Sequence, residues 1–183
     1  MIITVEIIFG LILLFVAFWQ ASLLYSSIFG APTVYANKQA VADALKLAET
    51  KKGETVLDLG CGNANSLIIA ARKFGARGIG VEISPYCYLK SRWNVRLTQQ
   101  SKNIRIYLSD LKKAKELIKS ADVLYLYLLN CDLAKIEDEV FENIKSNCRV
   151  VTLAFQFPNK KPIKTIATRN LGRETTIKLY VKS

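Results

Sequence analysis

The stretch from Glu54 to Asn65 constrains the fold more than any other part of this chain. It reads as an apolar strand that places Asp58 near its end, then as two glycines that turn the backbone, then as the start of a helix. Glycine is needed at Gly60 and Gly62, because a side chain there would prevent a ligand from lying against the main chain. The pattern therefore predicts a ligand site at a strand-to-helix turn.

A second acidic residue, Glu82, lies twenty residues after Gly62, at the end of an apolar strand predicted at residues 78–81. An acid at this place can accept hydrogen bonds from both hydroxyls of a ribose. Free amides at the start of the helix after the turn would face the same ligand. Together these features predict a nucleoside site.

The details of the turn restrict the kind of nucleoside. Gly62 is followed by Asn63, Ala64 and Asn65, so the third glycine of the dinucleotide pattern is missing. Asp58 beside the turn would also repel a phosphate, whereas it suits a ligand with an amino group and a sulfonium. The structural alternative is a generic doubly wound fold with a tight turn.

These residues resemble the class I S-adenosylmethionine-dependent methyltransferases. The first motif of that family is similar to Val56–Gly62, its ribose-binding acid is similar to Glu82, and the resemblance covers roughly residues 31 to 157. In many members an acid placed like Asp110, directly after the third strand, accepts a hydrogen bond from the adenine amino group; a helix cap is the alternative role. The resemblance implies S-adenosyl-L-methionine as cofactor and the following binding residues: Asp58, Gly60, Cys61, Gly62, Asn63, Glu82 and Asp110.

The rest of the chain fits this fold, because predicted helices and strands alternate from about residue 37 onward, as a mostly parallel sheet requires. The fold class is α/β: a doubly wound, mostly parallel, Rossmann-like methyltransferase sheet with a C-terminal antiparallel hairpin. Strands are predicted at residues 55–59, 78–81, 104–108, 123–129, 149–157, 163–168 and 175–181. Helices are predicted at about residues 37–50, 64–74, 84–100, 111–119 and 133–144.

The first 29 residues differ in kind from the rest. Glu6 is the only charged side chain there, and Ile7–Phe18 is an apolar run interrupted only by Gly10. With the apolar residues that follow, the run is long enough to cross a bilayer, and Trp19 and Tyr25 suit its boundaries. We therefore expect a transmembrane anchor over residues 1–29 and a methyltransferase domain over residues 30–183. A buried hydrophobic helix or an oligomer contact is the alternative.

The net charge of +11 and the lack of histidine limit the function further. Without histidine, acid-base catalysis by imidazole and histidine ligation of a metal are both excluded. The four cysteines show no paired metal spacing, and no metal is expected. Lys38 is nearly alone beside the apolar run, so the positive-inside rule gives only a lean, but S-adenosylmethionine is made in the cytosol. We expect the domain on the cytoplasmic side of a membrane.

The acceptor side is predicted at the end of the fourth strand, Tyr127–Asn130. Methyltransferases that act on adenine or glutamine amides often have an Asn/Asp-Pro-Pro-aromatic stretch there, and this chain has no such prolines. The apolar start, the segment Ala31–Ala36 and the stretch Phe155–Pro158 resemble the small membrane-anchored lysine methyltransferases, which act on membrane proteins such as the c-ring protein of ATP synthase and the adenine nucleotide carrier.

That resemblance implies transfer of a methyl group to a lysine amine of a membrane-associated protein, in a site shielded by aromatic side chains. No general base is assigned, and ordinary packing is the alternative role of each acceptor-side candidate. Two competing functions stay open: an RNA methyltransferase that uses the basic surface, and a non-catalytic membrane scaffold of the same fold. A lipid or quinone acceptor is a further alternative. The acceptor-side candidates are Tyr35, Tyr127, Asn130, Phe155 and Phe157.

Overall fold

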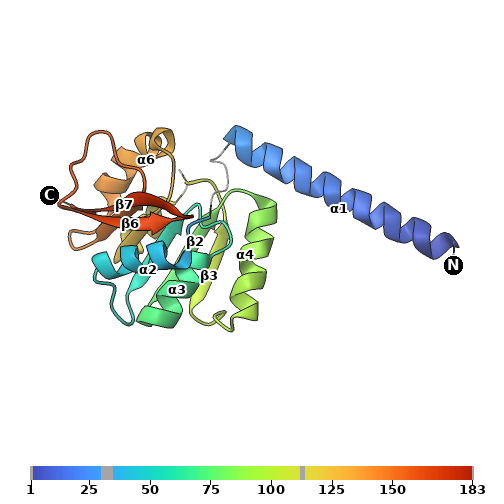
Figure 1. Ribbon diagram of the computed structural model, residues 1–183, viewed down its shortest axis with the longest axis horizontal. Helices are drawn as coiled ribbons and strands as arrows, with labels where there is room; N and C mark the ends of the chain where they lie inside the picture. The colour runs from blue at the N-terminus through green and yellow to red at the C-terminus, as the bar shows by residue number, and fades with distance from the viewer. Residues whose placement is uncertain (1, 30–34, 112–113, 183) are drawn as a thin grey trace.

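A seven-stranded sheet forms the centre of the domain in the computed structural model, which describes residues 2–29, 35–111 and 114–182. The strand order is β3-β2-β1-β4-β5-β7-β6 (Figure 1). The strands from β1 to β5 pair in parallel, while β7 is antiparallel to both β5 and β6, so the predicted sheet and hairpin are confirmed. The strands are β1 Thr55–Leu59, β2 Arg77–Glu82, β3 Ile104–Leu108, β4 Val123–Leu126, β5 Arg149–Leu153, β6 Lys164–Asn170 and β7 Arg173–Val181.

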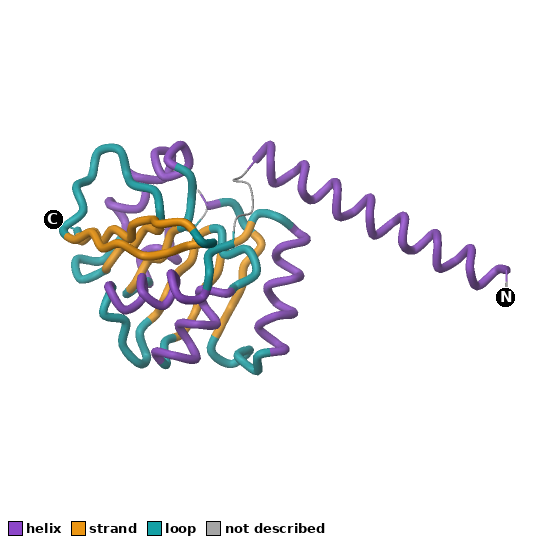
Figure 2. Tube along the Cα trace, viewed as in Figure 1, coloured by secondary structure: helices purple, strands orange, loops and turns teal. Residues whose placement is uncertain are grey.

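Helices cover both faces of this sheet (Figure 2). One hydrophobic cluster joins α2, α3 and α4 to one face, and a second joins α5 and α6 to the other. Because side chains alternate along a strand, Val56 and Asp58 of β1 face the first cluster, and Leu57 and Leu59 face the second. The helices are α2 Lys38–Leu47, α3 Asn65–Phe74, α4 Pro85–Leu97, α5 Lys115–Ser120 and α6 Asn130–Asn143.

Local signals explain where most of these elements begin. The side chain of Asn37 accepts a hydrogen bond from the Ala40 amide and caps α2. Ser84 caps α4 in the same way by accepting from the Cys87 amide, and Pro85 fits the first turn. The predicted bounds of β1 and β3 are confirmed.

Three predicted bounds near the acceptor side are wrong. The fourth strand ends at Leu126 rather than at residue 129, and α6 begins at Asn130 rather than at residue 133. The fifth strand ends at Leu153, because Ala154 has a positive φ of 66° that turns the chain out of the sheet.

The helix α1, Ile2–Phe29, extends away from the domain (Figure 1). Its segment Thr4–Ser22 is apolar and long enough to cross a membrane, and none of it is buried within the protein. The C-terminal part of α1 contacts the start of α4, where the rings of Trp19 and Tyr86 are 6.4 Å apart. Residues 31–34 of the predicted segment before the domain lie outside the described residues.

Candidate functional site

Asp58 is buried near the carboxyl end of β1. Its side chain is 4% exposed and accepts a hydrogen bond from the hydroxyl of Ser66 on α3. Burial raises the pKa of Asp58 from 3.8 to about 7; the bond from Ser66 opposes this shift, and the charge of Glu82 adds to it. Tyr125 of β4 is its neighbour in the sheet, and among the described residues the buried Tyr125 hydroxyl has no hydrogen-bond partner.

Glu82 ends β2 with a carboxylate that is fixed by the main chain. One oxygen accepts from the amide of Gly62 at 2.8 Å, and the other accepts from the amide of Ser84 at 2.9 Å. Burial raises the pKa of Glu82, although these amide bonds oppose the shift. The Ser109 amide donates to the main-chain oxygen of Glu82, which brings the end of β3, and Asp110 after it, beside the end of β2.

The glycine turn leaves open space next to these carboxylates. Gly60 has a φ of +83°, and a Cβ there would come within 3.1 Å of the Leu128 side chain. Gly62 also has a positive φ, of 54°. The amides of Gly60 and Cys61 both donate to the carbonyl of Val81, which holds the turn against β2. The turn is therefore rigid and accessible at its main chain, as the two glycines predict.

Cys61 and Asn63 support the turn from within. The Cys61 sulfur packs so closely over Gly80 that a Cβ at position 80 would be 2.7 Å from it. Burial raises the pKa of the Cys61 thiol well above its ordinary value. The Asn63 side chain accepts from the Asn65 amide, and its carbonyl accepts from the Asn94 side chain. These two predicted residues therefore shape the turn, and only their main chain is available to a ligand.

The acceptor-side candidates at the ends of β4 and β5 lie together. The rings of Tyr127 and Phe155 stack with 6.1 Å between their centroids and 27° between their planes. The Asn130 side chain, in the first turn of α6, accepts from the amide of Gln156 and so ties the two strand ends to each other. Three of the five candidates thus form one aromatic and polar edge.

Asn170, at the end of β6, is a residue of this edge that sequence reasoning missed. It is 6% exposed, donates to the hydroxyl of Tyr127 at 2.9 Å, and accepts from the amide of Asn37 at 2.8 Å. The Asn37 side chain donates to the main-chain oxygen of Arg169. An asparagine before Leu171-Gly172 reads as an ordinary hairpin residue, so the sequence alone gives no signal for this bridge.

The two remaining candidates lie apart from this pair. Phe157 is 1% exposed and packs edge-to-face against Phe141 and Tyr180 in the second hydrophobic cluster. Its position favours the packing role. Tyr35 is partly exposed, and the ammonium of Lys90 on α4 lies 5.3 Å from its ring centroid. Tyr35 therefore lies beside the start of the domain and α4.

The carboxyl ends of β1 and β2 fit S-adenosylmethionine. The Glu82 carboxylate has acceptor sites beyond the two used by the amides, and these can receive ribose hydroxyls. A side chain at Gly60 would fill the space where the ligand must lie. Asp58 and the unpartnered Tyr125 hydroxyl supply polar groups for the methionine part. No group of three potential metal ligands was found among the described residues.

Fold and site together define a class I S-adenosylmethionine-dependent methyltransferase. The family model described as the ANTKMT methyltransferase domain matches residues 58–164, which is more than half of the chain. The chain therefore belongs to this methyltransferase family, and its cofactor is S-adenosylmethionine.

Three similar proteins extend this result. A Xenopus laevis lysine N-methyltransferase, named for the C-type ATP synthase protein that it modifies, is 27% identical over 148 residues; the match covers 77% of this chain and 64% of that enzyme, less than two thirds of its length. A protein-lysine N-methyltransferase of Saccharolobus islandicus is 24% identical, with 82% and 92% covered. The solved RNA methyltransferase of Salinibacter ruber, in complex with S-adenosyl-L-homocysteine, is 30% identical with a TM-score of 0.75, and the match covers 81% of this chain and 94% of that one.

Proposed function

We propose that this protein transfers a methyl group from S-adenosylmethionine to a lysine amine of a membrane-associated protein. The observation that carries the proposal is the match to the ANTKMT methyltransferase domain, and two of the similar proteins are lysine methyltransferases. The aromatic edge of Tyr127 and Phe155 at the end of β4 supports it, because related enzymes admit the acceptor there.

The cofactor side would be held by residues of β1, β2 and the turn between β1 and α3. The Glu82 carboxylate accepts from the ribose hydroxyls, and Asp58 faces the amino group of the methionine part. Asp110 lies where it can accept from the adenine amino group. When bound, S-adenosylmethionine supplies an electrophilic methyl group on a positively charged sulfur.

The acceptor side must deliver a neutral amine in line with that sulfur. A lysine is protonated in water at neutral pH, and burial between Tyr127 and Phe155 would lower its pKa by desolvation. Asn130 lies at the same edge and can orient the amine. The amine nitrogen bonds to the methyl carbon as the carbon–sulfur bond breaks, and the extra proton leaves to solvent.

The membrane part of the proposal rests on α1. We propose that Thr4–Ser22 crosses the membrane once, with residues 30–183 as the methyltransferase domain on the cytoplasmic side. The hydroxyl oxygen of Ser22 is 2.9 Å from that of Ser84, which in turn donates its amide to Glu82. A cofactor site so close to the end of the span suits a lysine at headgroup level.

The test is transfer of labelled methyl from S-adenosylmethionine to a membrane fraction of the source cells, with Glu82→Ala as the inactive control. Label on a lysine of one membrane protein would support the proposal and identify the substrate. Label on lipid would keep the cofactor site and change the acceptor. No label together with no binding of S-adenosyl-L-homocysteine would leave a non-catalytic membrane scaffold.

A second candidate is an RNA methyltransferase. It is favoured by the 30% identity to the Salinibacter ruber enzyme and by the net charge of +11, since basic surfaces bind the RNA backbone. In the same assay it predicts label on RNA, together with an affinity for RNA that falls steeply as the salt concentration rises.

A further inference from the structure

The outer face of α4 carries a row of exposed apolar side chains. Leu89, Trp93 and Leu97 follow one another at intervals of four residues, so they share one face of the helix. They are 54%, 61% and 64% exposed. Apolar side chains of this size aligned in solvent mark a contact surface rather than part of a core.

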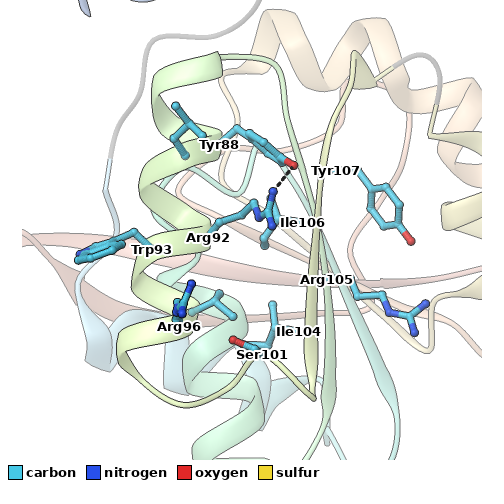
Figure 3. A pocket seen from close by; sticks show the side chains of 11 residues that line it. Tyr88, Arg92, Trp93, Arg96, Ser101, Ile104, Arg105, Ile106 and Tyr107 are labelled. Carbon is cyan, nitrogen blue, oxygen red and sulfur yellow. Dashed lines mark hydrogen bonds between the residues drawn. The ribbon is translucent and has the colours of Figure 1, made fainter. Parts of the chain in front are cut away.

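Positive charge surrounds this row. The segment from Ile83 to Ser109 contains no Asp or Glu and has five cations: Lys90, Arg92, Arg96, Lys102 and Arg105. A groove of about 880 Å³ runs between α4 and β3, lined among others by Tyr88, Arg92, Arg96 and Tyr107. Figure 3 shows the side chain of Arg92 directed toward this groove and bonded to Tyr88, whereas Trp93 points away from it.

The position of α1 indicates what this surface contacts. Ser22, the last residue of the apolar span, accepts a hydrogen bond from the Tyr86 amide at 3.0 Å, and Trp19 packs near the Tyr86 ring. The first turn of α4 is therefore held at the level where the span ends. In Figure 1, α4 lies on the side of the domain toward which α1 extends.

We propose that the outer face of α4 is a second membrane contact, which lies in the headgroup region of an anionic phospholipid bilayer. Leu89, Trp93 and Leu97 enter the boundary of the acyl chains, and the neighbouring Lys90, Arg92 and Arg96 contact lipid phosphates. This inference rests on the membrane anchor in the proposed function. RNA would need similar cations and aromatic rings, but the contact between α1 and α4 favours lipid.

The consequence concerns orientation. A single anchoring helix leaves the domain free to tilt and rotate, whereas a second contact through α4 fixes the side that faces the bilayer. Because Ser84 caps α4 and donates its amide to Glu82, the ribose end of the cofactor site would then be fixed relative to the membrane surface. The effective concentration of a membrane-embedded lysine at the site would rise accordingly.

The test uses the two tryptophans of the chain, Trp19 and Trp93. In the full-length Trp19→Phe variant, Trp93 is the single remaining reporter. The variant is placed in phosphatidylcholine vesicles, with and without phosphatidylglycerol, that contain lipids brominated near the headgroup. The proposal expects a blue-shifted emission that bromine quenches about twofold, with stronger quenching in the anionic vesicles. Emission typical of water that bromine does not quench would overturn it.

A matched pair of charge variants sharpens the result. Arg92→Gln/Arg96→Gln should remove the extra quenching in anionic vesicles, whereas Lys161→Gln/Lys164→Gln, at and just before β6 on the opposite edge of the sheet, should preserve it. Equal effects of the two pairs would contradict a specific role for α4. Both pairs should retain binding of S-adenosyl-L-homocysteine.

Two further measurements separate this inference from others. If sodium carbonate extracts the chain from the vesicles, the anchor of the proposed function fails and this inference fails with it. If the chain stays in the vesicles and Trp93 is unquenched, only the α4 contact fails. Stronger quenching of Trp93 by a short single-stranded RNA in detergent than by anionic vesicles would make the face a nucleic-acid surface and overturn the proposal.

Discussion

The two sides of the site are built in different ways. The cofactor side consists of neighbouring strand ends, and its central contact, from the Gly62 amide to the Glu82 carboxylate, joins residues only 20 positions apart. The acceptor side depends on Asn170, which binds Asn37 across 133 positions and Tyr127 across 43. A fixed cofactor half and a separately assembled acceptor half allow the acceptor to change while the cofactor site stays the same.

The largest expected effect is at Glu82. Glu82→Ala removes the ribose acceptor and also leaves the amides of Gly62 and Ser84 without their partner. Two charge-assisted hydrogen bonds contribute about 1.5–3 kcal/mol each, so affinity for S-adenosyl-L-homocysteine should fall by on the order of 100-fold or more. Calorimetric titration measures this.

Glu82→Gln is the matched control for shape. It keeps one oxygen acceptor and should lose less affinity than Glu82→Ala, while thermal unfolding should show that both variants are folded. Unchanged affinity in a folded Glu82→Ala variant would show that the cofactor lies elsewhere and would remove the basis of the comparison between the two sides.

A second, smaller effect concerns the proton on Asp58. Its pKa of about 7 lies above the ordinary 3.8, so the folded chain holds this proton more tightly than the unfolded chain. Without cofactor, the free energy of unfolding should therefore fall as pH rises from about 4 to about 7, by up to about 4 kcal/mol. The cationic amino group of the ligand favours the ionised carboxylate, so binding should release a proton below about pH 7.

The measurement is calorimetry of S-adenosyl-L-homocysteine binding near pH 6 in two buffers with different ionisation enthalpies. We expect release of up to about one proton, and an affinity that rises up to about tenfold per pH unit toward 7. Asp58→Asn should abolish the difference between the buffers. The same proton release in Asp58→Asn would assign the proton to another group.

The same contrast explains how far the sequence alone could predict the site. The strand bounds of β1, the cap of α4 at Ser84 and the place of Glu82 follow from local patterns of apolar residues, glycine, serine and proline. These patterns act over a few residues, so they survive in any context. The prediction of the family, the fold and the cofactor from them is confirmed.

The acceptor side was harder to predict, because its geometry depends on tertiary contacts. Apolar continuity past Leu126 predicted a longer strand, whereas Asn130 already begins α6. A positive φ at a non-glycine residue such as Ala154 leaves no mark in the sequence. The same holds for the burial of Phe157 and for the bridge made by Asn170, which only the paired hairpin brings to Tyr127.

The third prediction tests that bridge. Asn170→Ala removes the hydrogen bonds to the Asn37 amide and the Tyr127 hydroxyl, which are worth about 1 kcal/mol each. Methyl transfer, measured as kcat/KM for the acceptor, should fall about tenfold, with affinity for S-adenosyl-L-homocysteine nearly unchanged. Tyr127→Phe, which loses only one of the bonds, should show a smaller loss. A parallel loss of cofactor affinity would mean that the two sides are not independent.

The smallest expected effect distinguishes the stacked ring of Phe155 from the buried ring of Phe157. Phe155→Leu removes the stack on Tyr127 at a partly exposed position, so kcat should fall a few-fold with little change in the melting temperature, since such a pair is worth about 0.5–1.5 kcal/mol. Phe157→Leu leaves Phe141 and Tyr180 without an edge-to-face partner, so it should lower the free energy of unfolding by about 1 kcal/mol or more and leave kcat unchanged. Denaturant unfolding and initial rates on the same preparations make the comparison. If Phe157→Leu lowered kcat and Phe155→Leu did not, the acceptor would lie toward the rings of the second cluster rather than beside Tyr127, and the acceptor side would have to be placed again.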